Sequence, residues 1–80
     1  MLTKKLKRMD KLKQFVDNNI KTFSNLDNSE VQEIELSDIE ITSDMVDYLK
    51  SAKHNRFDYN GICVYYVKKS NNIWVENMDS

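Results

Sequence analysis

The chain has 80 residues and a mass of 9.5 kDa, which is enough for one domain spanning 1–80 and too little for a second. Its composition is 40% hydrophobic and 31% charged, which is typical of a globular protein and argues against a disordered one. No run approaches the roughly 18 apolar residues of a membrane span, and the basic N-terminus lacks the apolar stretch of a secretory signal.

Residues suited to catalysis are scarce. The single cysteine, Cys63, excludes an internal disulfide and a cysteine-based zinc cluster, and it favours a reducing, cytoplasmic setting. The single histidine, His54, has no spacing that pairs it with Cys63, and one glycine cannot build a phosphate-binding loop. A metal-dependent nuclease centre at Glu33, Glu35 and Asp38 is the catalytic alternative, but surface strands carry such acids routinely. The sequence therefore predicts a protein that is not an enzyme and needs no metal or cofactor.

Charge is distributed unevenly along the chain, although the formal net charge is only −1. Residues 1–21 have a net charge of +5, residues 22–47 contain eight acids and no lysine or arginine, and residues 48–80 have a net charge of +2. Because screening acts over about 8–10 Å, such segments can produce separate local fields for a partner to recognise. The alternative is that elements of opposite charge simply pack beside each other.

The first predicted element is a long helix over residues 2–23. The apolar side chains that recur at helical spacing are Leu2, Leu6, Met9, Leu12, Val16, Ile20 and Phe23. The basic residues on the opposite side are Lys4, Lys7, Arg8 and Lys11. The apolar positions also fit a heptad repeat, which predicts a parallel homodimer through this helix. The alternative is an amphipathic helix that covers the sheet of its own domain.

A strand is predicted after the polar, turn-like segment 24–29. Residues 33–36 alternate acidic and apolar side chains, as a half-buried strand does. The alternation slips at Ser37-Asp38 and resumes at 39–41. A one-residue slip would turn every following side chain to the wrong face, so we expect either a β-bulge or a tight turn that divides two strands.

Residues 44–54 are predicted to form a short helix. Thr42, Ser43 and Asp44 supply N-cap chemistry at its start. Acids near the start and basic residues near the end match the direction of the helix dipole. The sequence thus places a second helix between the first strand and the rest of the sheet.

The last third of the chain is predicted to be β-structure. Asn60-Gly61, between two alternating segments, is the strongest hairpin signal in the sequence. A second turn at 69–72 leads into a final strand, which puts Trp74 on the same sheet face as Tyr65. The fold class is therefore α+β, with a long N-terminal helix, one strand, a short helix and a three-stranded antiparallel meander (α-β-α-β-β-β).

Three surfaces are candidate binding sites. The first is an acidic row on the outward side of the first strand, formed by Glu33, Glu35, Asp38 and Glu40. The second is the aromatic pair Tyr65 and Trp74, residue types enriched in binding hot spots, unless the first helix covers that face and makes it core. The third is the basic side of the first helix, which would contact phosphates. For the acidic row, the alternative is a charged edge strand that resists aggregation.

The leading functional hypothesis is a small, non-catalytic inhibitor or adaptor that binds a host protein which processes nucleic acid, such as a CRISPR effector. Carboxylates that repeat every ~6.6 Å along a strand resemble the charge spacing of a nucleic-acid backbone, so a nucleic-acid-binding enzyme could dock on them as on its substrate. A composition rich in Lys, Asn and Ile, together with the small size, is typical of accessory proteins of phages or mobile elements. The alternative is a small regulator that binds nucleic acid directly through Lys4, Lys7, Arg8 and Lys11.

Overall fold

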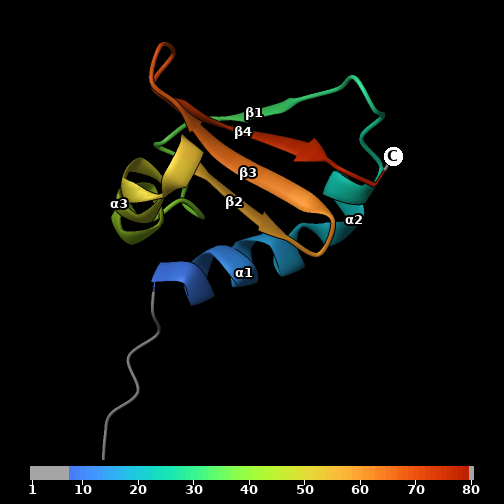
Figure 1. Cartoon of the computed structure of the whole chain (residues 1–80). Helices are drawn as coiled ribbons and strands as arrows, with labels where there is room; N and C mark the ends of the chain where they lie inside the picture. Colours follow the sequence, from blue (N-terminus) through green and yellow to red (C-terminus); the bar gives the residue numbers. More distant parts are fainter. Residues whose placement is uncertain (1–7, 80) are drawn as a thin grey trace, which may run out of the picture.

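The structure, a computed structural model, describes residues 8–79 (Figure 1). Its elements in chain order are α1 (Arg8–Asn18), α2 (Ile20–Ser24), β1 (Gln32–Ile34), α3 (Ser43–Ser51), the 3₁₀ turn η1 (Lys53–Asn55), β2 (Arg56–Tyr59), β3 (Ile62–Val67) and β4 (Asn72–Asn77). Helices on one side of an antiparallel sheet confirm the predicted α+β class.

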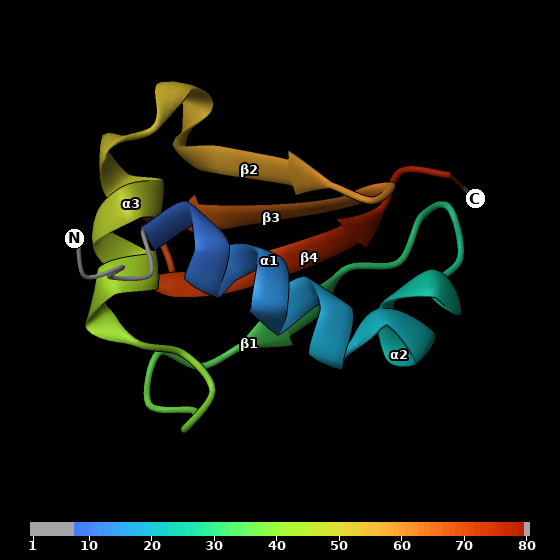
Figure 2. The ribbon, with the colours of Figure 1, turned by 90° about the horizontal axis from the view of Figure 1, so that it is seen from below.

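The four strands form one antiparallel sheet in the order β1-β4-β3-β2. β2, β3 and β4 are the predicted meander, because each pairs with the next strand along the chain. β1 joins this meander beside β4, so the first strand of the sequence lies next to the last (Figure 2). β1 and β2 are therefore the two edges of the sheet.

The first helix is shorter and less regular than predicted. Within the described residues it breaks at Asn19, which separates α1 from α2, while residues 2–7 of the predicted helix lie outside the described range. The Asn19 side chain donates a hydrogen bond to the carbonyl oxygen of Phe15 at 2.8 Å. Asparagine competes in this way for backbone groups that a continuous helix would use, which explains the break.

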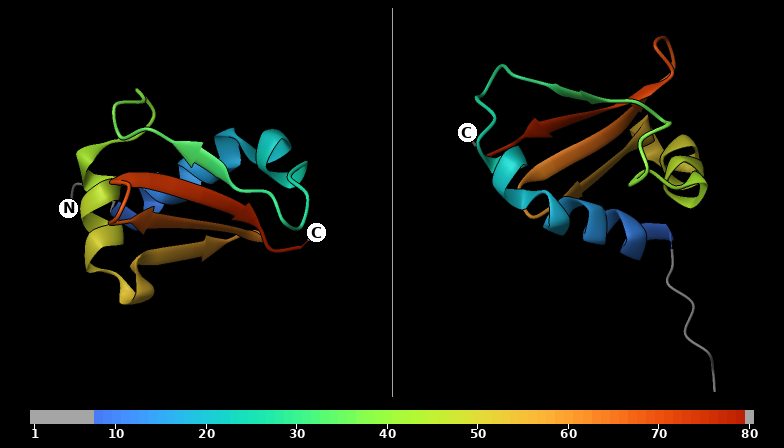
Figure 3. Two further views of the ribbon diagram at one scale, coloured as in Figure 1. Left: turned by 90° about the horizontal axis from the view of Figure 1, so that it is seen from above. Right: turned by 180° about the vertical axis from the view of Figure 1, so that it is seen from behind.

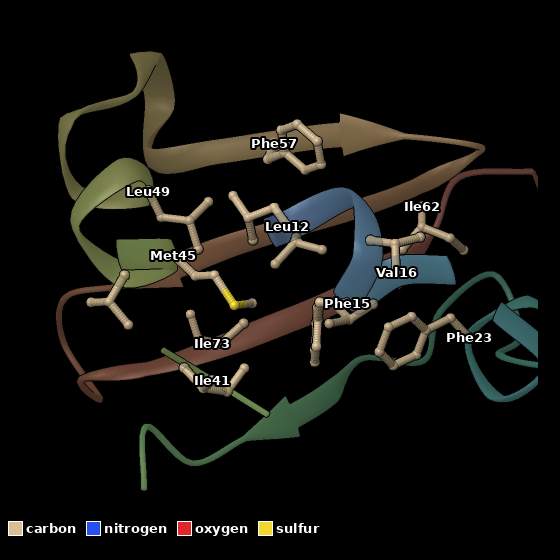
Figure 4. Close-up of a cluster of buried hydrophobic side chains, with 13 residues drawn as sticks. Leu12, Phe15, Val16, Phe23, Ile41, Met45, Leu49, Phe57, Ile62 and Ile73 are labelled. Atoms are coloured by element: carbon tan, nitrogen blue, oxygen red, sulfur yellow. The ribbon is translucent and has the colours of Figure 1, made fainter. Parts of the chain in front are cut away.

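The two helices cover the sheet of their own chain. Leu12 and Val16 of α1 are fully buried, and Phe15 contacts Phe23 of α2 with ring centroids 5.6 Å apart. Figure 4 shows these side chains in one cluster with residues of α3 and the sheet. Burial of each such side chain contributes about 1.5–3 kcal/mol. Val16 and Phe23 were the positions of the predicted coiled-coil seam, and they are already occupied by the chain's own core.

The prediction of a strand that continues through residues 35–41 is wrong. β1 ends at Ile34, and the chain then turns: the Asp38 side chain accepts a hydrogen bond from the backbone N–H of Glu40 at 2.9 Å, and its carbonyl oxygen accepts one from Ile41 at 2.9 Å. The expected β-bulge is wrong, and the tight turn is present without a second strand after it. Because Asp38 satisfies these backbone groups locally, Ile39 is left 95% exposed at the tip.

The helix predicted over residues 44–54 is present as α3, but it ends early. Thr42 is its N-cap, and its hydroxyl oxygen accepts a hydrogen bond from the backbone N–H of Met45 at 3.3 Å. The helix ends at Ser51 and not at residue 54. η1 follows, in which His54 and Asn55 have φ angles of 59° and 55°, and two successive left-handed residues cannot continue an α-helix.

The predicted hairpin turn is confirmed at Asn60-Gly61. Both residues have positive φ, 54° and 77°, as the tight primed turn between two strands requires. The second turn begins one residue earlier than predicted, at 68, and keeps its length of four residues. The face assignment is therefore unchanged, and Tyr65 lies directly opposite Trp74.

Candidate functional site

The two faces of the sheet have different surroundings. α1 and α2 pack on one face, and no helix of residues 8–79 covers the other, which we call the outer face; in Figure 3 (left) the strands lie in front of these helices. Because side chains alternate along each strand, the pairing registers define its members. The charged, aromatic and thiol side chains of the outer face are Glu33, Arg56, Asp58, Cys63, Tyr65, Trp74 and Glu76.

Tyr65 and Trp74 form the centre of the outer face. They are a directly opposed pair on the two inner strands, with ring centroids 6.1 Å apart and an interplanar angle of 64°. Both side chains are half-buried. The indole Nε1 of Trp74 is buried and has no hydrogen-bond partner among the described residues. Since buried donors are almost always paired, this N–H is an unsatisfied group at the centre of an uncovered face.

The charges around the aromatic pair are mainly negative. Glu33 is exposed on β1 directly opposite Trp74, and Glu76 is half-buried on β4. Arg56 lies on the other side of the aromatic pair, but its guanidinium binds the Asp58 carboxylate with Nη2–O distances of 2.9 and 3.0 Å. The Asp58 carboxylate neutralises the charge of Arg56, so the carboxylates of Glu33 and Glu76 give the outer face a net negative charge.

Two titratable groups on the outer face stay protonated at neutral pH. Burial, reinforced by the Asp58 carboxylate, raises the pKa of the Cys63 thiol to about 12. Burial and the nearby Glu76 carboxylate raise the pKa of the Tyr65 hydroxyl. A neutral, buried thiol is a poor nucleophile, so Cys63 acts here as a small residue beneath longer side chains.

The structure separates the four predicted acidic residues. All four are exposed, but Glu33 lies on the outer face, whereas Asp38 and Glu40 line a hollow on the side of α1 and α2, next to Phe15. Glu40 accepts a hydrogen bond from the Asn19 side chain at 2.8 Å. Glu35 follows the end of β1. A single straight row, as expected from a strand over 33–41, is therefore not formed.

Within the described residues, an ion pair joins the acidic segment to α1, in addition to the Asn19–Glu40 hydrogen bond. Lys11 of α1 binds the Asp44 carboxylate at the start of α3, with the Nζ and Oδ2 atoms 2.5 Å apart. Within residues 8–79, Glu33 and Glu35 form no ion pair. Glu33 and Glu35 thus remain without a basic partner from the described part of the chain.

The predicted basic surface is only partly described. Lys4 and Lys7 lie outside the described residues, and Arg8 is the first residue of α1. Lys11 is half-buried and pairs with Asp44. The described part of the helix therefore does not present Lys11 as a free phosphate ligand.

The alternation of the strands predicts Arg56 and Asp58 on the face of Tyr65, and the pairing registers confirm it. Sequence reasoning missed Glu76, which the same alternation places two residues after Trp74 on that face. In the range 8–79, no three His, Cys, Asp or Glu side chains lie in positions to hold a metal ion. No helix in that range is long and apolar enough to cross a membrane.

Comparison of the chain with protein-family models, with curated proteins and with solved structures finds no match.

Proposed function

We propose that the protein is a non-catalytic inhibitor or adaptor that binds a basic surface of a nucleic-acid-processing protein through its outer face. The observation that carries this proposal is the Tyr65–Trp74 pair at the centre of a sheet face that no helix of residues 8–79 covers. The opposite face of the same strands carries the buried hydrophobic core, so the aromatic pair is not needed to close that core. A CRISPR effector is one example of such a partner.

The aromatic pair has the properties of a binding anchor. Trp and Tyr are enriched in hot spots because they bury a large area at a low cost in conformational entropy. The pair lies on the two central strands, and strands hold side chains more rigidly than loops do. A partner that packs on the pair would bury the part of both side chains that the folded chain leaves exposed.

The surrounding charges favour a basic partner. Glu33 and Glu76 flank the aromatic pair, and Glu35 extends the negative charge past the end of β1. Proteins that hold nucleic acid carry basic surfaces for its phosphates, and electrostatic complementarity speeds the encounter with such a surface. The proposed binding mode is thus an aromatic centre flanked by carboxylates that pair with basic side chains of the partner.

The test uses Trp74, which is the only tryptophan of the chain and therefore a reporter at the proposed site. A partner captured from a host lysate and identified by mass spectrometry is purified and titrated against the protein. We expect a change in tryptophan emission from the wild-type chain if the partner lacks tryptophan at the interface, and at least tenfold weaker binding for Tyr65→Ser and Glu33→Lys.

The matched control is Asp27→Lys, which makes the same charge change on an exposed loop away from the outer face. We expect this variant to bind within about twofold of wild type, since an isolated remote charge acts mainly through screened long-range attraction. Unchanged binding of Tyr65→Ser and Glu33→Lys, with circular dichroism showing both folded, would contradict the proposed site.

A further inference from the structure

We infer that the end of the molecule formed by α3, η1 and the β3–β4 turn contacts the phosphate backbone of a nucleic acid. The contact is made by a set of side chains that we call the lysine cluster: Lys50, Lys53, Lys68 and Lys69. This inference rests on the proposed function in one respect, because a partner that processes nucleic acid brings that nucleic acid within reach. It concerns a different surface and different residues from the outer-face site.

The fold brings two distant segments together at this end. Lys50 lies in the last turn of α3 and Lys53 in η1, which packs against β3, while Lys68 and Lys69 belong to the β3–β4 turn. Figure 1 shows this turn and α3 at the same end of the sheet, and Figure 3 (right) shows the same arrangement from behind.

Tyr66 connects the two segments. The Lys50 ammonium lies 5.3 Å from the centroid of its ring, and the Tyr66 hydroxyl donates a hydrogen bond to Oδ1 of Asn71 at 2.7 Å. Asn71 is the last residue of the turn, so one side chain contacts both the helix and the turn. The position of Lys50 relative to the turn that carries Lys68 and Lys69 is thereby fixed by folding and need not be established during binding.

The turn itself is closed by several hydrogen bonds. The backbone N–H of Asn71 donates to the carbonyl oxygen of Val67 at 2.8 Å, and the Ser70 hydroxyl donates to Oδ1 of Asn72 at 2.6 Å. Asn71 has a φ of 55°, in the left-handed region that asparagine adopts more readily than most residues. Lys68 and Lys69 are therefore presented on an ordered turn.

The cluster has more positive charge than nearby carboxylates can balance. All four lysines are exposed, and none forms an ion pair within residues 8–79. Following the helix and the sheet, the nearest acidic residues are Asp47 and Glu35. Asp47 lies one turn before Lys50 on α3, and Glu35 follows Ile34, which pairs with Ile73 near the start of β4. Gathering like charges gives no advantage to folding, and it creates a local field that attracts polyanions.

Nucleic acid fits this cluster better than a membrane surface does. Lysine ammonium groups bind phosphates as point charges, and an affinity of this kind needs no apolar contact. Binding to a membrane surface also depends on apolar side chains that enter the lipid. The exposed large apolar residues of the described range are Met9, Ile39 and Met78, and none belongs to α3, η1 or the β3–β4 turn.

The experiment measures fluorescence anisotropy of labelled, mixed-sequence single-stranded DNA and RNA with the isolated full chain at two salt concentrations. We expect weak, salt-sensitive binding by wild type. The double variant Lys68→Glu/Lys69→Glu should reduce the slope of log affinity against log salt concentration by about 1.4, which is about 0.7 for each phosphate of a single strand that a lysine no longer neutralises. The control Lys13→Glu/Lys21→Glu makes the same charge change on α1 and α2, and it should leave that slope unchanged.

Two results would overturn the inference and leave the proposed function intact: no binding by wild type at low salt, or equal weakening of binding in the two double variants. Equal competition by polyglutamate, or equal binding to phosphatidylserine vesicles, would assign the cluster to another polyanion and also overturn it. Trp74 fluorescence separates the two proposals. If the oligonucleotide quenches Trp74 fluorescence in the Lys68→Glu/Lys69→Glu variant as it does in wild type, nucleic acid binds the outer face. That result would contradict the proposed function.

Discussion

The inner face of the sheet, on which α1 and α2 pack, and the outer face are built from alternate residues of the same strands. The two faces nevertheless differ in how completely they are packed. On the inner face, Val64 and Val75 are fully buried in the same hydrophobic cluster as Leu12 of α1. On the outer face, Tyr65 and Trp74 are half-exposed, and one buried N–H is left without a partner. The difference indicates that the inner face supplies most of the folding free energy, while the outer face is free to carry function.

The largest expected effect comes from the inner face. Leu12→Ala removes a fully buried side chain at the contact between α1 and the sheet. We expect a loss of about 3 kcal/mol in the free energy of unfolding, because the cavity is only partly closed by relaxation. Urea denaturation followed by circular dichroism measures this loss. A loss below about 1 kcal/mol would show that the inner face is not the main source of stability.

The next largest effect concerns Asn77, which is buried on the inner face at the end of β4. Its side-chain amide donates hydrogen bonds to the carbonyl oxygens of Ser24 and Leu26, at 3.0 and 3.3 Å. Asn77→Ala leaves those carbonyls without this donor, and we expect a loss of about 1–2 kcal/mol in the free energy of unfolding. Asn77→Asp should be no better, since a carboxylate cannot donate to either carbonyl oxygen.

A smaller effect on stability is expected from the buried thiol of Cys63 on the outer face. The pKa of the Cys63 thiol is raised to about 12 in the folded chain, whereas an unfolded cysteine titrates near 8.5–9. Between these values the unfolded chain loses its proton first, so stability falls as the pH rises above about 9. We expect a loss of about 1 kcal/mol at pH 9.5 from this group.

Cys63→Ala is the control for that pH dependence. The variant lacks the thiol, so its stability should fall less steeply between pH 9 and pH 10 than that of wild type, when both are measured by urea denaturation. Lysine and tyrosine titrations are common to both chains and cancel in the difference. Parallel curves for the two chains would mean that the thiol titrates normally and is not protected by the fold.

The smallest effect on stability is expected at the exposed outer face. Glu33→Gln changes a side chain that forms no ion pair within the described residues, so the free energy of unfolding should change by less than about 0.5 kcal/mol. Thermal unfolding by calorimetry checks this value. A larger loss would show that Glu33 supports the fold and would weaken its assignment to partner binding.

The sequence predicted those parts of the fold that depend on local chemistry. The N-cap at Thr42 and the turn at Asn60-Gly61 each follow from one or two residues, and both are confirmed. The prediction was wrong where one side chain redirects the backbone. Asn19 breaks the long helix although the apolar spacing continues across it. At Asp38 the slip in the alternation indicated an irregularity, but it did not decide between a bulge and a turn that ends the strand. Periodicity measures burial, and it does not detect competition for backbone hydrogen bonds.

The candidate site was predicted in part for a similar reason. Alternation along β3 and β4 is a local rule, so it placed Tyr65 and Trp74 on one face. Which face the helices cover depends on long-range packing, which alternation alone does not determine. The pairing of β1 with β4 is likewise long-range, and it brings Glu33 to Trp74. A sequence pattern can identify the strands of a sheet, but their spatial order requires the structure.

The position of β1 has a consequence for the order of assembly. β2, β3 and β4 are joined by short turns, so their pairing closes small loops and should form early. β1 has only three residues and pairs with a strand far along the chain, so its hydrogen bonds should form last and exchange their amide protons first. One rim of the proposed binding site would then be able to open locally while the meander stays intact, which would let it adjust to partners of slightly different shape.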